Sequence, residues 1–221
     1  MRSRKPGKIA LLISAVSLGL LVAHVAAGVP VKERELDWVL KRTPDKANGA
    51  KLYETCAACH GNSGEGVSDG TVPVIGGQSA AVIAKQIVDF RAGTRREPRM
   101  EHFTDVHHLA YSQHIADVSA YVATLTPAVT QRKFSTEVIG RGSLLFARSC
   151  ERCHGTAGEG NEDELTPRMA SQHFEYLVRQ LDRSATEWRP AMPEKHATLV
   201  SRVSRDDLTA IATYLSSVGG P

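Results

Sequence analysis

The chain has 221 residues, a length that suits one large domain or two small ones. Apolar residues make up 42% and charged residues 23%, which excludes both a disordered chain and a protein that crosses a membrane many times. Four cysteines are too few for a disulfide scaffold of this size. The formal net charge of +3 comes from residues 1–43, which hold 8 Lys and Arg against 3 Asp and Glu. The remainder therefore has no basic excess with which to bind nucleic acid.

The first 29 residues have the composition of an export signal or a membrane anchor. Four basic residues lie within the first eight positions and precede an apolar run over residues 9–29. This pattern, with small residues up to Ala27, is typical of a cleaved secretory signal, but the run is also long enough to remain as an anchor. In both cases the positive end stays in the cytoplasm and the remainder crosses the membrane. We expect a signal peptide or membrane anchor over residues 1–27 and an N-terminal extension over residues 28–43.

One segment of the chain occurs twice. Residues 56–61 read Cys-Ala-Ala-Cys-His-Gly, and residues 150–155 read Cys-Glu-Arg-Cys-His-Gly, an offset of 94 positions. The same offset continues downstream in further matched residues: Gly64 and Gly158, Pro73 and Pro167, Gln78 and Gln172, and Gln86 and Gln180. A chance repeat of six residues does not carry such a series, so we infer two tandem copies of one unit.

Each copy is predicted to be helical. Apolar residues recur at helical spacing over residues 79–90 and 115–125 in the first copy and over residues 174–181 and 208–215 in the second. No run alternates with period two for long enough to suggest a sheet. We therefore predict an all-α protein.

A polar stretch that begins at Pro127 separates the two copies. The predicted boundaries are residues 44–126 for the first domain, 127–136 for the linker and 137–221 for the second domain.

The two Cys-x-x-Cys-His segments have the spacing that attaches haem c. Two thiols three residues apart can add to the two vinyl groups of one porphyrin, and the histidine that follows can bind the iron. The predicted covalent attachment residues are Cys56, Cys59, Cys150 and Cys153. His60 and His154 are the predicted proximal iron ligands, which implies two covalently bound haem c groups.

Three other uses of the cysteines fit less well. A thioredoxin-type dithiol needs a βαβ context that the sequence does not show. A structural zinc ion needs four ligands, and each motif supplies three close together. A disulfide within Cys-x-x-Cys is strained and uncommon.

The sixth coordination position of each iron distinguishes an electron carrier from a catalyst. A methionine opposite the histidine raises the reduction potential and fills that position, whereas an open position allows catalysis. Met100 and Met192 lie 40 and 38 residues beyond His60 and His154, in irregular stretches immediately before the last helix of each copy. We predict that both methionines are iron ligands. Met169 is predicted to pack in the core.

Several charged and imidazole side chains surround the two methionines. Arg95, Arg96, Arg99, Trp188 and Arg189 flank them and are either donors to haem propionates or solvated loop residues. Four histidines follow Met100: His102, His107, His108 and His114. One of them could replace Met100 on the iron, but the second copy has only His196 at a comparable place. We expect the cluster to lie on the surface, and its role stays open.

The chain resembles the cytochrome c4 family of two-domain, diheme class I c-type cytochromes over roughly residues 45–221. The resemblance rests on the doubled Cys-x-x-Cys-His-Gly, then Pro73-x-x-Gly76-Gly77-Gln78, then Gln86-x-x-x-Phe90-Arg91 before Met100. It implies two packed cytochrome c domains with haems near their interface. It also implies electron transfer from a quinol-oxidising complex to a terminal oxidase, with some members tethered to the membrane.

Two positions depart from the repeat. Phe146 stands four residues before Cys150, whereas Tyr53 stands three residues before the first cysteine, so the helix that enters the second haem is expected to shift. Ser171 replaces the glycine found at Gly77.

We therefore expect a periplasmic diheme electron carrier of a bacterial respiratory chain, soluble or tethered to the inner membrane through residues 9–29. It is expected to pass electrons between redox proteins, to have no catalytic residue and to bind no nucleic acid. The alternatives are a haem-bearing subunit of a membrane-bound oxidoreductase, a diheme peroxidase, or a redox or gas sensor.

Overall fold

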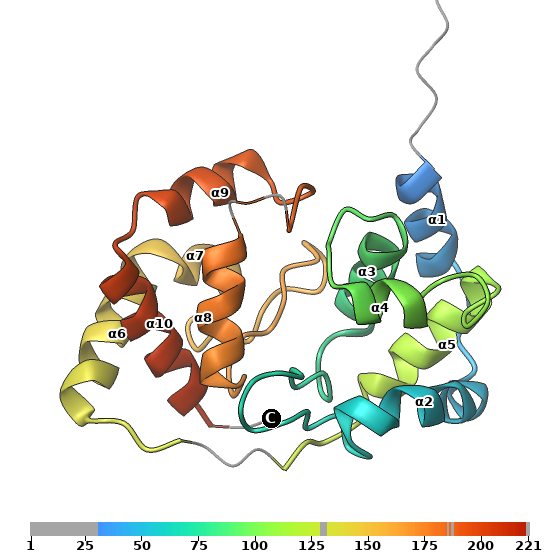
Figure 1. Cartoon of the computed structure of the whole chain (residues 1–221), viewed down its shortest axis with the longest axis horizontal. Coiled ribbons are helices and arrows are strands. Elements are labelled where there is room, and N and C mark those ends of the chain that lie inside the picture. Colours follow the sequence, from blue (N-terminus) through green and yellow to red (C-terminus); the bar gives the residue numbers. More distant parts are fainter. Residues whose placement is uncertain (1–30, 129–131, 185, 187, 220–221) are drawn as a thin grey trace, which may run out of the picture.

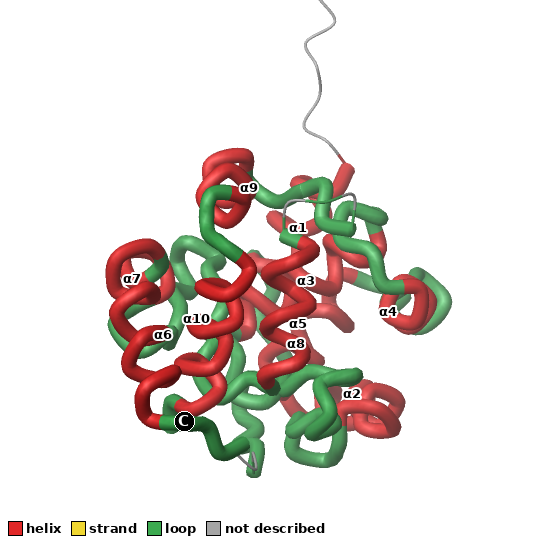
Figure 2. Tube along the Cα trace, turned by 60° about the vertical axis from the view of Figure 1, so that its left-hand side comes forward, coloured by secondary structure: helices red, strands yellow, loops and turns green. Residues whose placement is uncertain are grey.

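The computed structural model describes residues 31–128, 132–184, 186 and 188–219. The predicted signal peptide or anchor lies outside these ranges. Within them the chain forms helices and loops but no strand, apart from one antiparallel bridge between Asn161 and Thr166 (Figure 2). The predicted all-α class is confirmed. None of the helices described is both long and apolar enough to span a membrane.

The helices fall into two groups that follow the sequence repeat. Figure 1 shows α1–α5 on the right and α6–α10 on the left, with loops of both groups between them. The first group comprises α1 (Val31–Leu40), α2 (Lys46–His60), α3 (Ala80–Arg91), α4 (Pro98–Phe103) and α5 (Ser112–Val122). The second comprises α6 (Thr136–Ser149), α7 (Glu151–His154), α8 (Phe174–Arg183), α9 (Glu194–Ser201) and α10 (Arg205–Ser217).

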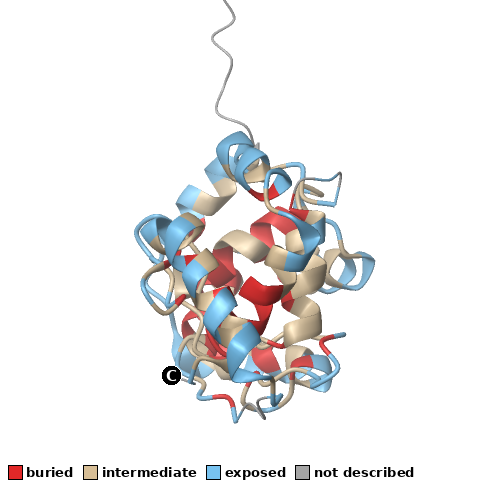
Figure 3. Ribbon diagram, turned by 90° about the vertical axis from the view of Figure 1, so that its left-hand side faces the viewer, coloured by how far each residue is buried: buried red, intermediate tan, exposed pale blue. Residues whose placement is uncertain are grey.

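Each group has a core of its own. Val88 and Ile115 are among the fully buried side chains of the first core, and Phe146 and Leu215 among those of the second. The buried positions lie on the inner faces of the helices and the exposed positions on the outside (Figure 3). This one-sided burial is what the helical spacing of apolar residues predicts.

Polar side chains set where several helices begin. Asp45, Ser79, Ser135 and Ser204 each accept a hydrogen bond from a backbone N–H in the first turn of the following helix. Such caps satisfy amide donors that have no partner within the helix.

In each group two helices cross at a glycine: α2 and α5 in the first group, and α6 and α10 in the second. A Cβ on Gly49 of α2 would lie 2.1 Å from the carbonyl oxygen of Asp117 in α5. A Cβ on Gly142 of α6 would lie 2.0 Å from the carbonyl oxygen of Ala210 in α10. Only glycine allows the two backbones to approach so closely, and both copies use it at the same crossing.

The one-residue difference before the second cysteine pair changes the helix as expected. In the first copy, α2 runs without interruption through both cysteines to His60. In the second copy the helix ends at Ser149, and Cys150 has φ −122° and ψ −33° before the short helix α7 begins. The extra residue is accommodated by this break.

The N-terminal extension contributes a helix that has no counterpart in the second copy. Helix α1 packs against α3 and α5, and its Val39 is buried in the first core. Lys32 of α1 forms an ion pair with the buried Asp89 at 2.6 Å, and Glu35 pairs with Arg91.

The two domains are joined by a reciprocal set of hydrogen bonds. The Gln78 side chain donates to the Arg168 carbonyl and accepts from the Arg168 N–H, each at 3.0 Å. The Gln172 side chain likewise donates to the Val74 carbonyl at 2.8 Å and accepts from the Val74 N–H at 2.9 Å. Since both residue pairs are related by the offset of 94, the repeat produces an interface that is nearly symmetric.

Candidate haem sites

The loop that follows each Cys-x-x-Cys-His segment folds in the same way in both copies. The Gly66 N–H donates to the His60 carbonyl at 2.8 Å, and the Gly160 N–H donates to the His154 carbonyl at 2.8 Å. Gly66 and Gly160 have φ of 68° and 83°, a region that glycine adopts readily and other residues rarely do. The glycines of the repeat thus turn the chain back beneath the histidine.

This turn gives both histidines the same hydrogen-bond partner. His60 Nδ1 lies 3.1 Å from the Pro73 carbonyl oxygen, and His154 Nδ1 lies 3.1 Å from the Pro167 carbonyl oxygen. A carbonyl oxygen can only accept, so Nδ1 carries the proton and Nε2 keeps its lone pair for a metal. Burial lowers the pKa of both imidazoles from the ordinary value, which favours the neutral form that ligation requires.

No disulfide joins the cysteines of either motif. Burial raises the pKa of Cys56 and Cys150 to about 11. A redox-active dithiol needs a thiol of lowered pKa, so these cysteines do not fit that use.

A cavity of about 470 Å³ brings the predicted ligands of the first domain together. Cys56, Cys59, His60 and Met100 all line it. Apolar side chains from α3 and α5 form further parts of the wall: Val82, Ile83, Ile87, Val118 and Val122. A thiol pair, an imidazole and a thioether around an apolar cavity are the groups that a covalently attached, flat and mostly apolar cofactor needs.

The two methionines lie in different local structures, and two predictions about them are wrong. Met100 is half-buried in the short helix α4, which begins at Pro98, and not in an irregular stretch. Met192 is half-buried in a bend just before α9. Neither directly precedes the last helix of its copy, because residues 104–111 follow α4 and α9 follows Met192. In the sequence Pro98 suggests irregular structure, but proline is also favoured in the first turn of a helix, and that is where it lies here.

A histidine of α9 faces His154, the predicted proximal ligand of the second domain. The ring centroids of His154 and His196 are 6.3 Å apart. His196 Nδ1 is buried without a hydrogen-bond partner. Burial, with His154 and Arg189 nearby, lowers the pKa of His196. Two imidazoles that bind one metal at about 2 Å place their centroids about 6 Å apart, so His196 is within reach of a metal on His154.

Comparisons with known proteins identify both copies. The family model described as cytochrome c matches residues 46–126, and the model described as cytochrome C oxidase, cbb3-type, subunit III, matches residues 137–215.

The chain is two cytochrome c domains in tandem, similar to cytochrome c4.

Cytochrome c4 of Azotobacter vinelandii is 27% identical over 79% of this chain and 89% of the relative. A protein of Stutzerimonas stutzeri named thiosulfate dehydrogenase electron acceptor is 29% identical over 82% of this chain and 91% of the relative. The crystal structure of reduced cytochrome c4 from Pseudomonas stutzeri matches with a TM-score of 0.71 at 23% identity, over 80% of this chain and all of the other. The resemblance in the repeat is therefore confirmed, and this tandem cytochrome carries two covalently bound haem c groups.

The interface holds a pair of arginines suited to the haem carboxylates. Arg95 donates to Gln86 and to Tyr176, and Arg189 donates to Gln180 at 3.0 Å. Neither arginine has a carboxylate partner among the described residues. Burial, and then the charge of Arg95, lowers the pKa of Arg189 to about 10.

Two partly buried cations whose side chains have no carboxylate within ion-pair distance can accept anions nearby, and haem propionates would supply them. Arg95, Arg189 and Tyr176 all line the cavity that also contains His60. The residues present therefore fit the cofactor. The sequence indicated the two arginines as candidate donors, but nothing in it showed that Tyr176, Gln86 and Gln180 would join them.

Proposed function

We propose that this tandem cytochrome carries electrons in a bacterial respiratory chain, in the periplasm, from a quinol-oxidising complex to a terminal oxidase or reductase. The cationic and apolar N-terminus supports export, whether it is cleaved or kept as a tether to the inner membrane. Similarity to cytochromes c4 and to a named electron acceptor supports the role of a carrier. Mass spectrometry of the mature chain tests the first point, because it reports cleavage at Ala27 and two haem additions together.

The proposed iron ligands are His60 with Met100 and His154 with Met192, and the proposed thioether links are those of Cys56, Cys59, Cys150 and Cys153. Haem c, when bound, takes up and releases one electron. The Pro73 and Pro167 carbonyls fix the tautomer and orientation of each imidazole, and burial favours its neutral form. A methionine sulfur bound to each iron would favour the reduced state and would leave no open coordination position for peroxide. For this reason we propose that the protein is not an enzyme.

The paired histidine to proline contacts are the observation that carries the proposal. They occur at the same distance in both copies and leave the same nitrogen available to a metal. The apolar cavity walls limit access of water, which also tunes the potential. The reciprocal glutamine contacts hold the two domains in one orientation, so that an electron can pass between their cofactors without domain movement.

Replacing one methionine at a time tests the ligands. We expect Met100→Ala and Met192→Ala each to remove about half of the methionine–iron charge-transfer absorption of the oxidised protein. Met169→Ala is the matched control, because Met169 lines the cavity and packs in the second core but is not a proposed ligand. Equal loss in all three variants would contradict the assignment.

His196 is the competing ligand of the second domain, since its ring faces His154. Under the proposal, His196→Ala leaves the absorption band of both haems intact. If His196 binds the iron instead, Met192→Ala changes nothing and His196→Ala opens the site to carbon monoxide.

A second candidate function is a haem-bearing subunit that serves a dehydrogenase. The thiosulfate dehydrogenase (TsdBA) of Marichromatium purpuratum matches with a TM-score of 0.69 at 29% identity, over 79% of this chain and 40% of that chain. Stable co-purification with a membrane-bound or soluble oxidoreductase would favour this subunit role over a free carrier.

A further inference from the structure

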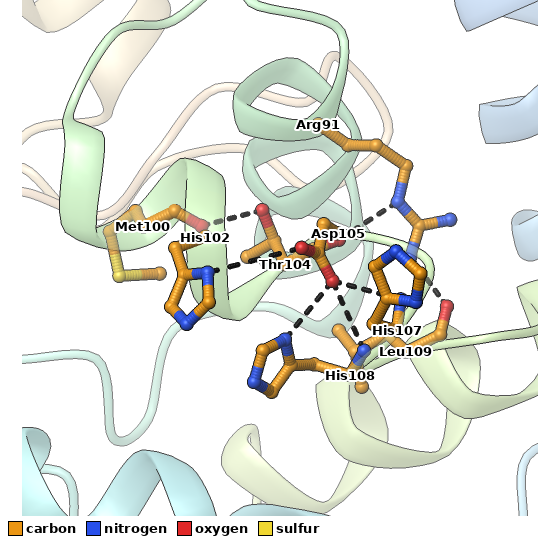
Figure 4. Close-up of polar contacts among 8 residues, drawn as sticks. All are labelled: Arg91, Met100, His102, Thr104, Asp105, His107, His108 and Leu109. Carbon is orange, nitrogen blue, oxygen red and sulfur yellow. Dashed lines mark hydrogen bonds and ion pairs between the residues drawn. The ribbon is translucent and has the colours of Figure 1, made fainter.

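A group of metal-binding side chains lies outside both haem sites, on the segment that follows Met100. His102, Asp105 and His108 each offer one ligand atom, and these atoms lie within 4.8 Å of one another. Figure 4 shows the His102 and His108 rings in contact with the Asp105 carboxylate, at the end of helix α4, which also carries Met100. In the described part of the chain no other three His, Cys, Asp or Glu side chains converge in this way.

The distances are close to those of a coordination sphere. Asp105 Oδ1 lies 3.0 Å from His108 Nδ1, and Asp105 Oδ2 lies 4.0 Å from His102 Nδ1. Metal–ligand bonds of about 2.0–2.2 Å in a tetrahedral site place neighbouring ligand atoms about 3.3–3.6 Å apart. His102 is 64% exposed, so a small rotation of a solvated side chain closes the set.

The carboxylate is already held in place and ionised. Asp105 Oδ1 accepts hydrogen bonds from the backbone N–H groups of His107 at 2.8 Å and His108 at 3.2 Å. A fixed, charged carboxylate reduces the ordering that a metal ion would otherwise have to impose.

We propose that His102, Asp105 and His108 form a surface site for a divalent zinc ion, with water completing the coordination. Two imidazoles and one carboxylate suit Zn²⁺, whereas Ca²⁺ and Mg²⁺ prefer oxygen ligands throughout.

The site is connected to the first haem through the last turn of α4. The Thr104 N–H and hydroxyl donate to the Met100 carbonyl at 2.9 and 2.7 Å, and Arg91 donates to the Thr104 carbonyl at 2.8 Å. Thr104 lies between His102 and Asp105 in the chain. A zinc ion bound to these two residues is therefore linked through Thr104 to Met100. The link between the zinc site and the first haem rests on the proposed ligation of iron by Met100. The added positive charge favours the reduced form and raises the potential of the first haem.

Calorimetric titration of the purified haem protein with Zn²⁺ tests the site. We expect one zinc ion per chain, no binding of Ca²⁺ or Mg²⁺, and affinity at least tenfold weaker in His102→Ala and in His108→Ala. Asp105→Asn gives the same loss while its amide oxygen can still accept from the backbone. His107→Ala is the matched control, an exposed neighbour outside the triad, and keeps the affinity of the parent.

A redox titration with and without Zn²⁺ tests the connection. One of the two potentials is expected to rise in the parent protein and to stay fixed in His108→Ala. Absence of saturable zinc binding, or binding unchanged in the His102→Ala/His108→Ala double variant, overturns the site. Zinc binding with both potentials unmoved overturns the connection to the haem. Failure of Met100 as an iron ligand appears separately, in the absorption band, since calorimetry counts zinc whatever binds the iron.

Discussion

The two halves of the molecule share the structure beneath the histidine and differ in what surrounds it. The turn from each Cys-x-x-Cys-His segment to the proline carbonyl is the same in both, with equal histidine to proline distances. The outer elements are not repeated. Helix α1 covers only the first domain, and the break at Cys150 occurs only in the second. The contacts that orient the two histidines are thus kept, while the helices packed around them differ.

Buried charge shows the difference most clearly. Asp89 and Asp117 are buried carboxylates of the first domain, and the repeat places Arg183 and Ala210 at the matching positions. Asp89 bonds to Lys32 and Lys85, and Asp117 accepts from the backbone of Asp45 and from two side-chain amides. The first domain therefore depends on ionised groups in a way that the second does not.

Removing the Asp89 charge is expected to have the largest effect. Asp89→Asn leaves Lys32 and Lys85 without their buried partner and should destabilise the first domain by about 3–5 kcal/mol. Asp37→Asn, in the exposed pair with Lys41, is the control and should cost less than about 1 kcal/mol. Hydrogen exchange measured separately on each domain checks this, and equal loss of protection in the second domain would contradict it.

The same carboxylates predict a dependence on pH. Burial by itself raises the pKa of Asp89, but its bonds to Lys32 and Lys85 outweigh burial and hold that pKa below 3.8. Stability from this group is present above pH 3.8 and is lost as the pH falls through the lower folded-state pKa. In acid unfolding, the first domain should lose stability more steeply than the second, and Asp89→Asn should reduce that difference.

The glycine crossings offer the next largest effect and should act alike in both halves. Gly142→Ala places a Cβ against the Ala210 carbonyl and should cost about 2–3 kcal/mol. Gly49→Ala should cost a similar amount. The control is Gly140→Ala on the same helix α6, where a Cβ meets nothing within 4 Å. That variant should stabilise by about 0.5–1 kcal/mol, as denaturant unfolding can measure.

A smaller change makes the first domain resemble the second. The Tyr53 hydroxyl donates to the Gly61 carbonyl at 2.7 Å, and Phe146 occupies the matching place without a hydroxyl. Tyr53→Phe should cost about 1 kcal/mol in unfolding free energy. Tyr111→Phe, at a tyrosine 67% exposed, should change nothing measurable. No difference between the two variants would show that the hydroxyl does not contribute.

The smallest expected effect concerns Ser171, which has φ 61° where Gly77 has φ 69°. Ser171→Gly removes the backbone strain but also the hydrogen bond from its hydroxyl to the Val218 carbonyl at 2.8 Å. Because each contributes about 1 kcal/mol, the net change should be near zero. Ser171→Ala loses only the hydrogen bond and should destabilise by about 1 kcal/mol. Thermal unfolding of the two variants distinguishes these contributions.

Local patterns in the sequence determined the attachment motif, the doubling, the helices over residues 79–90 and 174–181, and the all-α class. The haem attachment motif spans five consecutive residues, and a helix is recognised from apolar residues that recur every three or four positions. Both can therefore be read without knowing where distant segments lie.

Only the tertiary structure decided which distant side chains meet. It placed Arg95 beside Tyr176, His196 opposite His154, and helix α1 over the first core. It also folded Met100 into a helix, where the sequence suggested an irregular stretch. These outcomes follow from how the two domains and their loops pack, and the free energy of that packing is spread over contacts between residues far apart in the chain.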